Sequence, residues 1–182
     1  MKIIVAITGG SGMIYARQCI DALLASEQVE QIALIVSATA EQVLLHEGVS
    51  LPADGRITRF DNDNMFSSVA SGSASWDTMI IVPASMGTVG RIAAGVSLSL
   101  IERAADVMLK ERRRLILMVR EAPYSLIHLR NMTTLTEVGA IILPASPSFY
   151  FNPTTIEELC LPTTLRALEL AGLKIEHREW GE

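Results

Sequence analysis

Short aliphatic runs alternate with stretches of helical spacing along almost the whole chain. Each run is bounded by glycine, proline or polar residues, and an amphipathic stretch follows it. Strands are predicted over residues 2–8, 31–36, 78–82 (stopped by Pro83), 115–119 and 140–143, with a possible short strand at 57–60. Helices are predicted over residues 13–24, 39–47, 88–94, 98–112, 125–137 and 154–171, the last of which Pro162 could bend.

This alternation is typical of βαβ units, whose strands form a parallel sheet. The predicted fold class is α/β: a single doubly wound, Rossmann-like or flavodoxin-like three-layer domain over residues 1–182, with a mainly parallel sheet. Ligands of such sheets bind beyond the carboxyl ends of the strands. We therefore expect the loops after the strands to converge, namely residues 9–12, 37–39, 83–88, 120–121 and 145–150.

The composition fits a buried sheet and indicates an oligomer. Hydrophobic residues make up 49% of the 182 residues but aromatic residues only 5%, so the apolar excess is aliphatic. Aliphatic strands suit a parallel sheet that is covered on both faces. An apolar excess in a small domain must also be hidden somewhere, and we expect a homo-oligomer that buries it between subunits.

Charge and targeting signals exclude several other classes. The net charge of −5 argues against a nucleic-acid partner. No apolar run reaches the roughly 18 to 20 residues of a membrane helix, and the first residues lack the pattern of a signal peptide. We therefore expect no membrane span and a cytoplasmic location. Cys19 and Cys160 form no CxxC pair and are expected to be buried, without a disulfide or a metal.

The first strand ends abruptly in Gly9-Gly10-Ser11-Gly12, just before a helix. Glycines let a backbone approach an anion closely, and the N–H groups of the first helical turn favour negative charge. A phosphate is the expected guest. The Ser11 hydroxyl could cap the helix or face a bound cofactor.

Small hydroxyl residues follow two other strands. Ser37 follows the second strand, and Ser85 and Thr88 follow the strand at 78–82. Each could simply cap a helix. Three such turns at one edge of the sheet favour a phosphorylated cofactor.

Charged residues form a second set of candidates. Arg120 and Glu121 end a strand at the ligand edge, where the arginine could bind a phosphate and the glutamate could exchange a proton with a leaving group. Alternatively, the two form an ion pair on a solvated rim. Arg103 and Lys110 share one helix face, which is solvated unless it points into another subunit's site.

Aromatic residues add less. Tyr150 and Arg166 could together bind a phosphate, but their separation in the sequence says little by itself. Tyr15 and Phe149 are expected in the core.

With these residues in view, the chain resembles the flavin prenyltransferase family (UbiX/Pad type, formerly described as aromatic acid decarboxylases). The resemblance runs nearly end to end, and the block from Glu102 to Pro123 is its most specific part. It rests on several short motifs: Thr8-Gly9-Gly10-Ser11-Gly12, Ala70-Ser71-Gly72-Ser73, Pro83-Ala84-Ser85, residues 100–107 with Lys110-Glu111-Arg112, Val119-Arg120-Glu121-Ala122-Pro123, His128-Leu129-Arg130-Asn131-Met132, Gly139-Ala140 and Phe149-Tyr150.

The resemblance implies transfer of a dimethylallyl group from dimethylallyl phosphate to N5 and then C6 of reduced FMN, without a metal. The prenylated FMN would serve a UbiD-type decarboxylase, and the family implies a dodecamer. Positive charge from arginine and lysine side chains would replace that of a metal ion.

The resemblance also assigns roles to residues. Flavin contacts would fall on Gly10, Ser11, Gly12, Ser37, Ser85, Met86, Gly87, Thr88 and Arg120. Tyr150 and Arg166 would bind the prenyl phosphate, with Arg103 and Lys110 approaching from a neighbouring subunit. Glu121 would protonate the departing phosphate, Ser11 would lie near N5, and Glu47 would assist the final deprotonation.

Two departures from the family pattern bear on the substrate. Ala38 replaces the Lys of the common Ser-Lys-Ala-Ala, and Phe151 replaces a His after the Phe-Tyr pair. Either could alter the prenyl pocket or the choice between a monophosphate and a diphosphate donor.

Two other functions compete with this one. Residues 83–88 echo a motif of flavin-dependent cysteine decarboxylases, but the histidine that follows the first turn in those enzymes is absent here. The other rival is an FMN-binding accessory subunit of a decarboxylase, which would not need a second phosphate-binding set.

Overall fold

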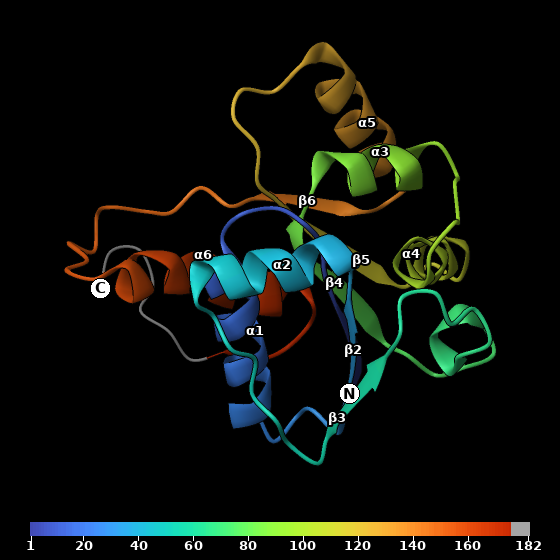
Figure 1. Ribbon diagram of the computed structural model, residues 1–182, viewed down its shortest axis with the longest axis horizontal. Coiled ribbons are helices and arrows are strands. Elements are labelled where there is room, and N and C mark those ends of the chain that lie inside the picture. Colours follow the sequence, from blue (N-terminus) through green and yellow to red (C-terminus); the bar gives the residue numbers. More distant parts are fainter. Residues whose placement is uncertain (176–182) are drawn as a thin grey trace.

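A six-stranded sheet runs through the middle of the protein in this computed structural model, which describes residues 1–175 (Figure 1). Its strands are β1 (Lys2–Ile7), β2 (Gln31–Val36), β3 (Ile57–Phe60), β4 (Thr78–Ala84), β5 (Arg114–Val119) and β6 (Ile141–Pro144). The order is β3-β2-β1-β4-β5-β6, and all neighbours are parallel. The predicted doubly wound α/β class is confirmed, in the Rossmann-type strand order, which reverses direction between β1 and β4.

Helices cover both faces of the sheet and complete three layers. They are α1 (Met13–Ala25), α2 (Ala38–Glu47), α3 (Met86–Ala93), α4 (Leu100–Lys110), α5 (Leu126–Glu137) and α6 (Ile156–Leu170), with a short 3-10 helix, η1 (Ser68–Ala70). One core cluster joins α1, α2 and α6 to the sheet, and the other joins α3, α4 and α5 to the opposite face.

Alternate residues of the central strands fill these two cores. In β1, Ile3, Val5 and Ile7 pack under α1 and α6, whereas Ile4 and Ala6 face α3 and α4. All of them are fully buried. This two-sided burial is why the central strands are aliphatic throughout, as the sequence indicated.

Strand β4 runs further than the sequence pattern predicted. Pro83 was expected to end the strand, yet β4 continues to Ala84, which pairs with Val119 of β5 after a shift of register. Pro83 lacks an N–H, but its carbonyl accepts hydrogen bonds from the backbone N–H (3.2 Å) and the hydroxyl (2.8 Å) of Thr8. Tertiary contacts thus hold the strand beyond the proline.

Other differences are small. Helix α3 begins at Met86 rather than at residue 88, because Ser85 caps it. Helix α4 is shorter than the predicted 98–112, since a capping box of Ser99 and Glu102 starts it two residues later, at Leu100, and it ends at Lys110. Helix α6 continues through Pro162, and η1 was not predicted.

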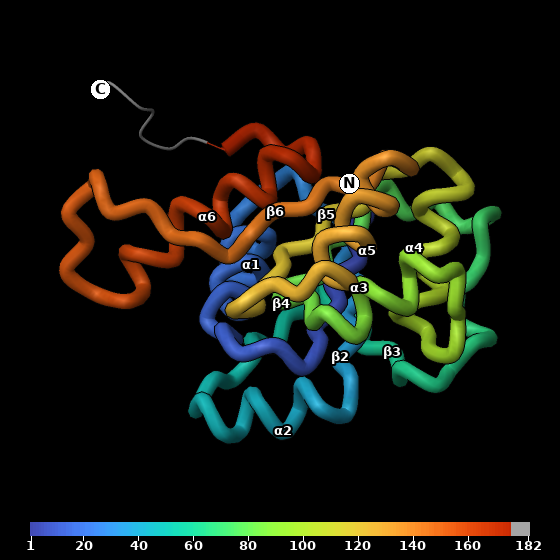
Figure 2. The backbone as a smooth tube through the Cα atoms, turned by 90° about the horizontal axis from the view of Figure 1, so that it is seen from above, coloured from blue at the N-terminus to red at the C-terminus, as the bar shows by residue number. Residues whose placement is uncertain are grey.

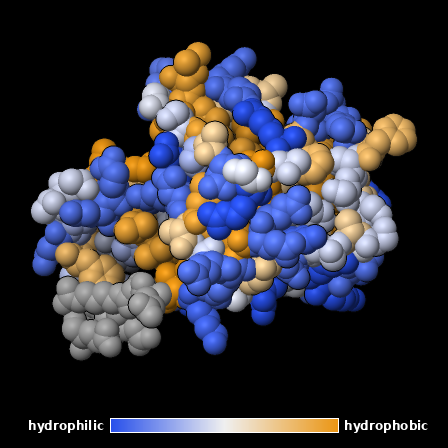
Figure 3. Space-filling model, turned by 90° about the horizontal axis from the view of Figure 1, so that it is seen from below, coloured by the Kyte–Doolittle hydropathy of each residue, from blue (hydrophilic) through white to orange (hydrophobic). Residues whose placement is uncertain are grey.

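The surface retains apolar side chains that a single chain leaves exposed. They reach the surface at several places on the face shown in Figure 3. Large exposed hydrophobic residues include Leu126, Ile127 and Leu129 of α5, and Phe149 was wrongly expected in the core, because it is 70% exposed. Tyr15 is buried as expected, as are the free Cys19 and Cys160. Within residues 1–175, none of the helices combines the length and apolarity needed to span a bilayer.

Candidate functional site

The turns after β1, β2, β4 and β5 meet at one edge of the sheet. The Thr8 hydroxyl accepts a hydrogen bond of 2.8 Å from the Ser85 N–H, which links the turns after β1 and β4. Arg120, after β5, donates from Nε to the Ser11 carbonyl at 3.1 Å. A Cβ on Gly9 would lie 2.5 Å from Thr39 Cγ2, so the first turn also packs closely against the start of α2. The predicted convergence is therefore confirmed for four of the five loops. The fifth, residues 145–150, is joined to the end of β5 by the Ala145 N–H, which donates to the Val119 carbonyl at 2.8 Å, and then lines a cavity beside α6.

Glu47, at the end of α2, reaches the start of α1. Its carboxylate accepts hydrogen bonds from the backbone N–H groups of Gly12 (2.9 Å) and Met13 (2.7 Å). Partial burial raises the pKa of this carboxyl. The two backbone hydrogen bonds, a hydrogen bond with the Ser11 hydroxyl and the charge of Arg120 outweigh that effect, so the net pKa of Glu47 is lowered.

This carboxylate changes the interpretation of the glycine turn. Gly12 N–H and Met13 N–H were expected to receive a phosphate, but Glu47 supplies the anion at this helix N-terminus. Ser11 does not cap the helix, because Gly12 is the N-cap residue and has no side chain to bond with. The exposed Ser11 hydroxyl instead lies beside Glu47, next to Arg120.

The turn after β4 has a different construction. Ser85 Oγ accepts from Thr88 N–H at 3.4 Å and lies 3.1 Å from Thr88 Oγ1. Thr88 and Met86 are buried, whereas Gly87 between them is exposed. Ser37 caps α2 through Ala40 N–H. Ser37 and Ser85 therefore do serve as helix caps, a role in which the serine oxygen accepts and its hydroxyl proton is not used.

Tyr150 and Arg166 line a separate cavity of about 700 Å³ between the 144–151 loop and α6. The ring of Tyr150 lies 4.3 Å from that of Phe151, centroid to centroid. Arg166 pairs with Glu169 at 2.9 Å. The structure thus brings these two predicted residues together. Figure 2 shows the loop that precedes α6 (orange) extending away from the sheet.

Arg103 and Lys110 are not brought to the site within one chain. They lie on α4, on the opposite side of the molecule from α6 in Figures 1 and 2. Arg103 donates to the Ala70 carbonyl at 3.1 Å and pairs with Asp106, while Lys110 pairs with Glu111. Glu121 accepts from the neighbouring Ala122 N–H.

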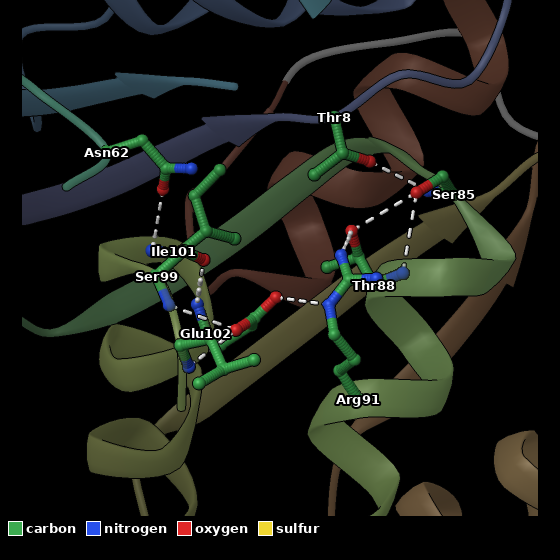
Figure 4. A network of polar contacts seen from close by, with 9 residues as sticks. Thr8, Asn62, Ser85, Thr88, Arg91, Ser99, Ile101 and Glu102 are labelled. Atoms are coloured by element: carbon green, nitrogen blue, oxygen red, sulfur yellow. Dashed lines mark hydrogen bonds and ion pairs between the residues drawn. The ribbon is translucent and has the colours of Figure 1, made fainter. Parts of the chain in front are cut away.

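A polar network at this edge joins predicted residues to two, Arg91 and Glu102, that the sequence analysis did not single out (Figure 4). It runs from Thr8 through Ser85 and Thr88 to Arg91 and Glu102. Glu102 could have been found from its spacing after Ser99, which is that of a capping box. Arg91 gave no comparable signal.

The residues at this edge fit a flavin mononucleotide. A Cβ on Gly10 would lie 3.3 Å from Pro83 Cβ, so glycine lets the first turn pack closely against the end of β4. The exposed hydroxyl of Ser11, the exposed Gly87 and the cationic Arg120 supply hydrogen-bond donors and close backbone approach. In residues 1–175, His, Cys, Asp and Glu form no cluster of three or more that could hold a metal ion.

Comparisons with known proteins agree with this site. Residues 1–164 match the family model Flavoprotein. Flavin prenyltransferase UbiX of Methanocaldococcus jannaschii is 39% identical over 188 residues, covering 100% of this chain and 99% of the relative.

Two solved structures are also close. The crystal structure of AnUbiX (PadA1) in complex with FMN and dimethylallyl pyrophosphate has a TM-score of 0.90, with 39% identity over 98% of each chain. A dodecameric FMN-dependent UbiX-like decarboxylase from Escherichia coli O157:H7 has a TM-score of 0.92, with 34% identity over the whole of both chains. The chain therefore belongs to the Flavoprotein family and, within it, to the flavin prenyltransferases.

Proposed function

We propose that this protein transfers a dimethylallyl group from dimethylallyl phosphate to N5 and C6 of reduced FMN. The observation that carries the proposal is the meeting of a hydroxyl, a carboxylate and a guanidinium at the ligand edge, supplied by Ser11, Glu47 and Arg120. Reduced FMN supplies the nucleophilic ring atoms. The chain's part is to position the two substrates and to handle charge and protons.

Each group has a task that suits its chemistry. Arg120 stabilises negative charge on the prenyl phosphate as the carbon–oxygen bond breaks, and Glu121 next to it gives a proton to that phosphate. Glu47, held as a carboxylate by its hydrogen bonds, accepts the proton that leaves C6 during ring closure. The proton displaced from N5 by the first bond is balanced by the proton that the prenyl double bond takes up when its far carbon bonds to C6. Ser11 lies between these groups and places its hydroxyl at the flavin.

The flavin itself is held by the turns after β1, β2, β4 and β5, through Gly10, Ser11, Gly12, Ser37, the segment 85–88 and Arg120. Tyr150 and Arg166 in the cavity beside α6 bind the prenyl phosphate. Positive charge at the phosphate comes from Arg166 and Arg120, with Arg103 and Lys110 of a neighbouring subunit, so the transfer needs no metal.

Arg103 and Lys110 act from a neighbouring subunit. Both lie on α4, on the opposite side of the molecule from α6, which lines the cavity, and the related E. coli protein is dodecameric. The same arrangement here makes the protein a homododecamer that hides its exposed apolar side chains. Its product is the cofactor of a UbiD-type decarboxylase, and a cytoplasmic location fits the two free, buried cysteines.

An anaerobic assay tests the proposal. The protein is incubated with reduced FMN and either dimethylallyl phosphate or the diphosphate, with and without EDTA. Mass spectrometry should show FMN heavier by one prenyl unit, and EDTA should make no difference. FMN binding without an adduct from either donor would instead support an accessory flavin-carrying subunit.

A further inference from the structure

The turn after β4 is connected to α4 by a chain of polar contacts that no proposed step yet uses (Figure 4). Ser85 Oγ lies 3.1 Å from Thr88 Oγ1, and Arg91 Nη2 donates to the same Thr88 oxygen at 3.3 Å. Arg91 Nε then donates to Glu102 Oε1. One guanidinium therefore bridges a hydroxyl of the proposed flavin turn and a carboxylate of the neighbouring helix.

Glu102 is a buried anion whose two oxygens are both satisfied. Its side chain is only 3% exposed, and Oε2 accepts from the N–H groups of Leu98 (2.8 Å) and Ser99 (3.0 Å). A buried carboxylate is costly unless it is paired in this way. Oε2 alone is enough to cap α4. Oε1 is therefore free for a second task, and it accepts the hydrogen bond from Arg91.

Arg91 is placed to act on the turn rather than to stabilise α4 alone. Its side chain is 46% exposed. Its Nη1 lies 3.2 Å from where a Cβ on Gly87 would stand, which puts the charge directly beside the exposed residue of the turn. A glycine at this position leaves room for the guanidinium.

The polarity of the contacts sets what the two hydroxyls can do. The Arg91 guanidinium can only donate, so Thr88 Oγ1 accepts in their hydrogen bond. The backbone N–H of Thr88 also can only donate, so Ser85 Oγ accepts from it. The Ser85–Thr88 pair therefore receives two outside donors, and the bond between the two hydroxyls uses one of their two protons. The other proton is not used within the pair, so the pair is biased to donate to a ligand oxygen or nitrogen.

We propose that Arg91, held in place by Glu102, is a positioning residue that makes the Ser85–Thr88 hydroxyl pair donate a hydrogen bond to the bound flavin. The proposal rests on the proposed function only in taking the ligand to be a flavin. Arg91 acts through Thr88, and Glu102 acts through Arg91.

A double-mutant cycle tests this dependence. Dissociation constants of oxidised FMN are measured by flavin fluorescence for wild type, Arg91→Met, Thr88→Val and the double variant. Each single change should weaken FMN binding by about tenfold, the value of one hydrogen bond to a charged or oriented donor. The double variant should bind about as weakly as Thr88→Val alone, because under this proposal Arg91 acts on the flavin only through Thr88.

Controls separate this role from a structural one. Arg17→Met removes an arginine that also joins a carboxylate and a neighbouring loop, Asp21 and Ser50, but lies outside the site. Arg17→Met should leave FMN binding unchanged. Thermal melting of each variant without FMN shows whether that variant folds. If Arg91→Met does not fold, Arg91→Lys replaces it, since lysine keeps the charge but cannot bridge both partners.

Two results would overturn the proposal: unchanged FMN binding in Arg91→Met, or losses that multiply in the double variant. Glu102→Gln tests the last contact of the chain. It should weaken FMN binding less than Arg91→Met does, because Glu102 acts only by holding Arg91. The cycle needs no prenyl donor. A wild-type protein that binds FMN but forms no adduct would thus refute the proposed function alone, and an additive cycle would refute this coupling alone.

Discussion

The Glu47 carboxylate accepts a hydrogen bond of 2.7 Å from the backbone N–H of Met13, the first residue of α1. An N–H group that a phosphate would otherwise use is thus bound by a side chain of the same chain. The helix N-terminus stabilises the charged form of this carboxylate. The proposed proton acceptor is therefore held ionised next to Ser11.

This contact makes stability depend on pH through Glu47. The pKa of Glu47 is lower in the folded protein than the ordinary value of 4.5, so the stabilisation is present above that value and is lost as the pH falls through the folded pKa. Glu47→Gln should lower the melting temperature at pH 7, and the difference from wild type should shrink in acid. Thermal melts over a pH series measure this.

The control for that series is Glu27→Gln, at an exposed glutamate in the loop after α1. Its melting temperature should equal that of wild type at every pH. If the melting temperature of Glu47→Gln stays below that of wild type by the same amount down to strongly acidic pH, the carboxylate charge contributes nothing to stability.

Gly9 is required for the close packing of two turns. An alanine Cβ would lie 2.5 Å from Thr39 Cγ2 and 2.9 Å from Thr39 Cβ, and rotation of the threonine relieves only the first contact. Gly9→Ala should cost about 1–3 kcal/mol of the free energy of unfolding, the usual range for overpacking. It should also weaken FMN binding, because the turn must shift.

Gly55→Ala is the matched control for this change. A Cβ at Gly55 meets nothing within 4 Å, so urea unfolding should give a free energy equal to that of wild type or slightly higher. Equal stabilities for the Gly9 and Gly55 variants would mean that the contact with Thr39 yields at no cost.

The sequence pattern was sufficient to predict the parallel sheet and the edge of the sheet where the loops meet. The central strands are aliphatic on both faces and separated by helical stretches, so their identity depends on local composition. The extension of β4 through Pro83 was missed because it depends on Thr8, a residue far away in the sequence. Local rules for proline could not include that partner.

The site was predictable only where a residue follows a strand. Ser11, Ser85 and Arg120 were found in that way. Arg91 was not, because its importance comes from a neighbour on another helix, Glu102. The pairing of Glu47 with the start of α1 also depends on how α2 packs, which no spacing in the sequence reveals.

Glu121 is proposed to protonate the departing phosphate, and its carboxylate already accepts a hydrogen bond from the Ala122 N–H at 2.9 Å. Glu121→Gln keeps an oxygen for that bond but cannot give up a proton to the phosphate. Adduct formation should slow by about a hundredfold or more, the usual contribution of a general acid, while FMN binding is unchanged. Stopped-flow measurements with reduced FMN and dimethylallyl phosphate follow the rate, with Glu27→Gln as control. A rate equal to that of wild type would remove Glu121 from the proposed mechanism.

Subunit complementation tests whether Arg103 completes the site of a neighbouring chain. Arg103→Ala and Arg166→Ala should each be nearly inactive, because each removes a cation from the phosphate. When the two variants are co-expressed and assemble at random, about a quarter of the sites should regain both cations: half of the sites have an intact Arg166, and half of those border a chain with an intact Arg103. Purification through two different tags selects the mixed oligomers, and the prenylation assay measures their activity. If both residues served the site of their own chain, every site would lack one cation and mixing would restore nothing.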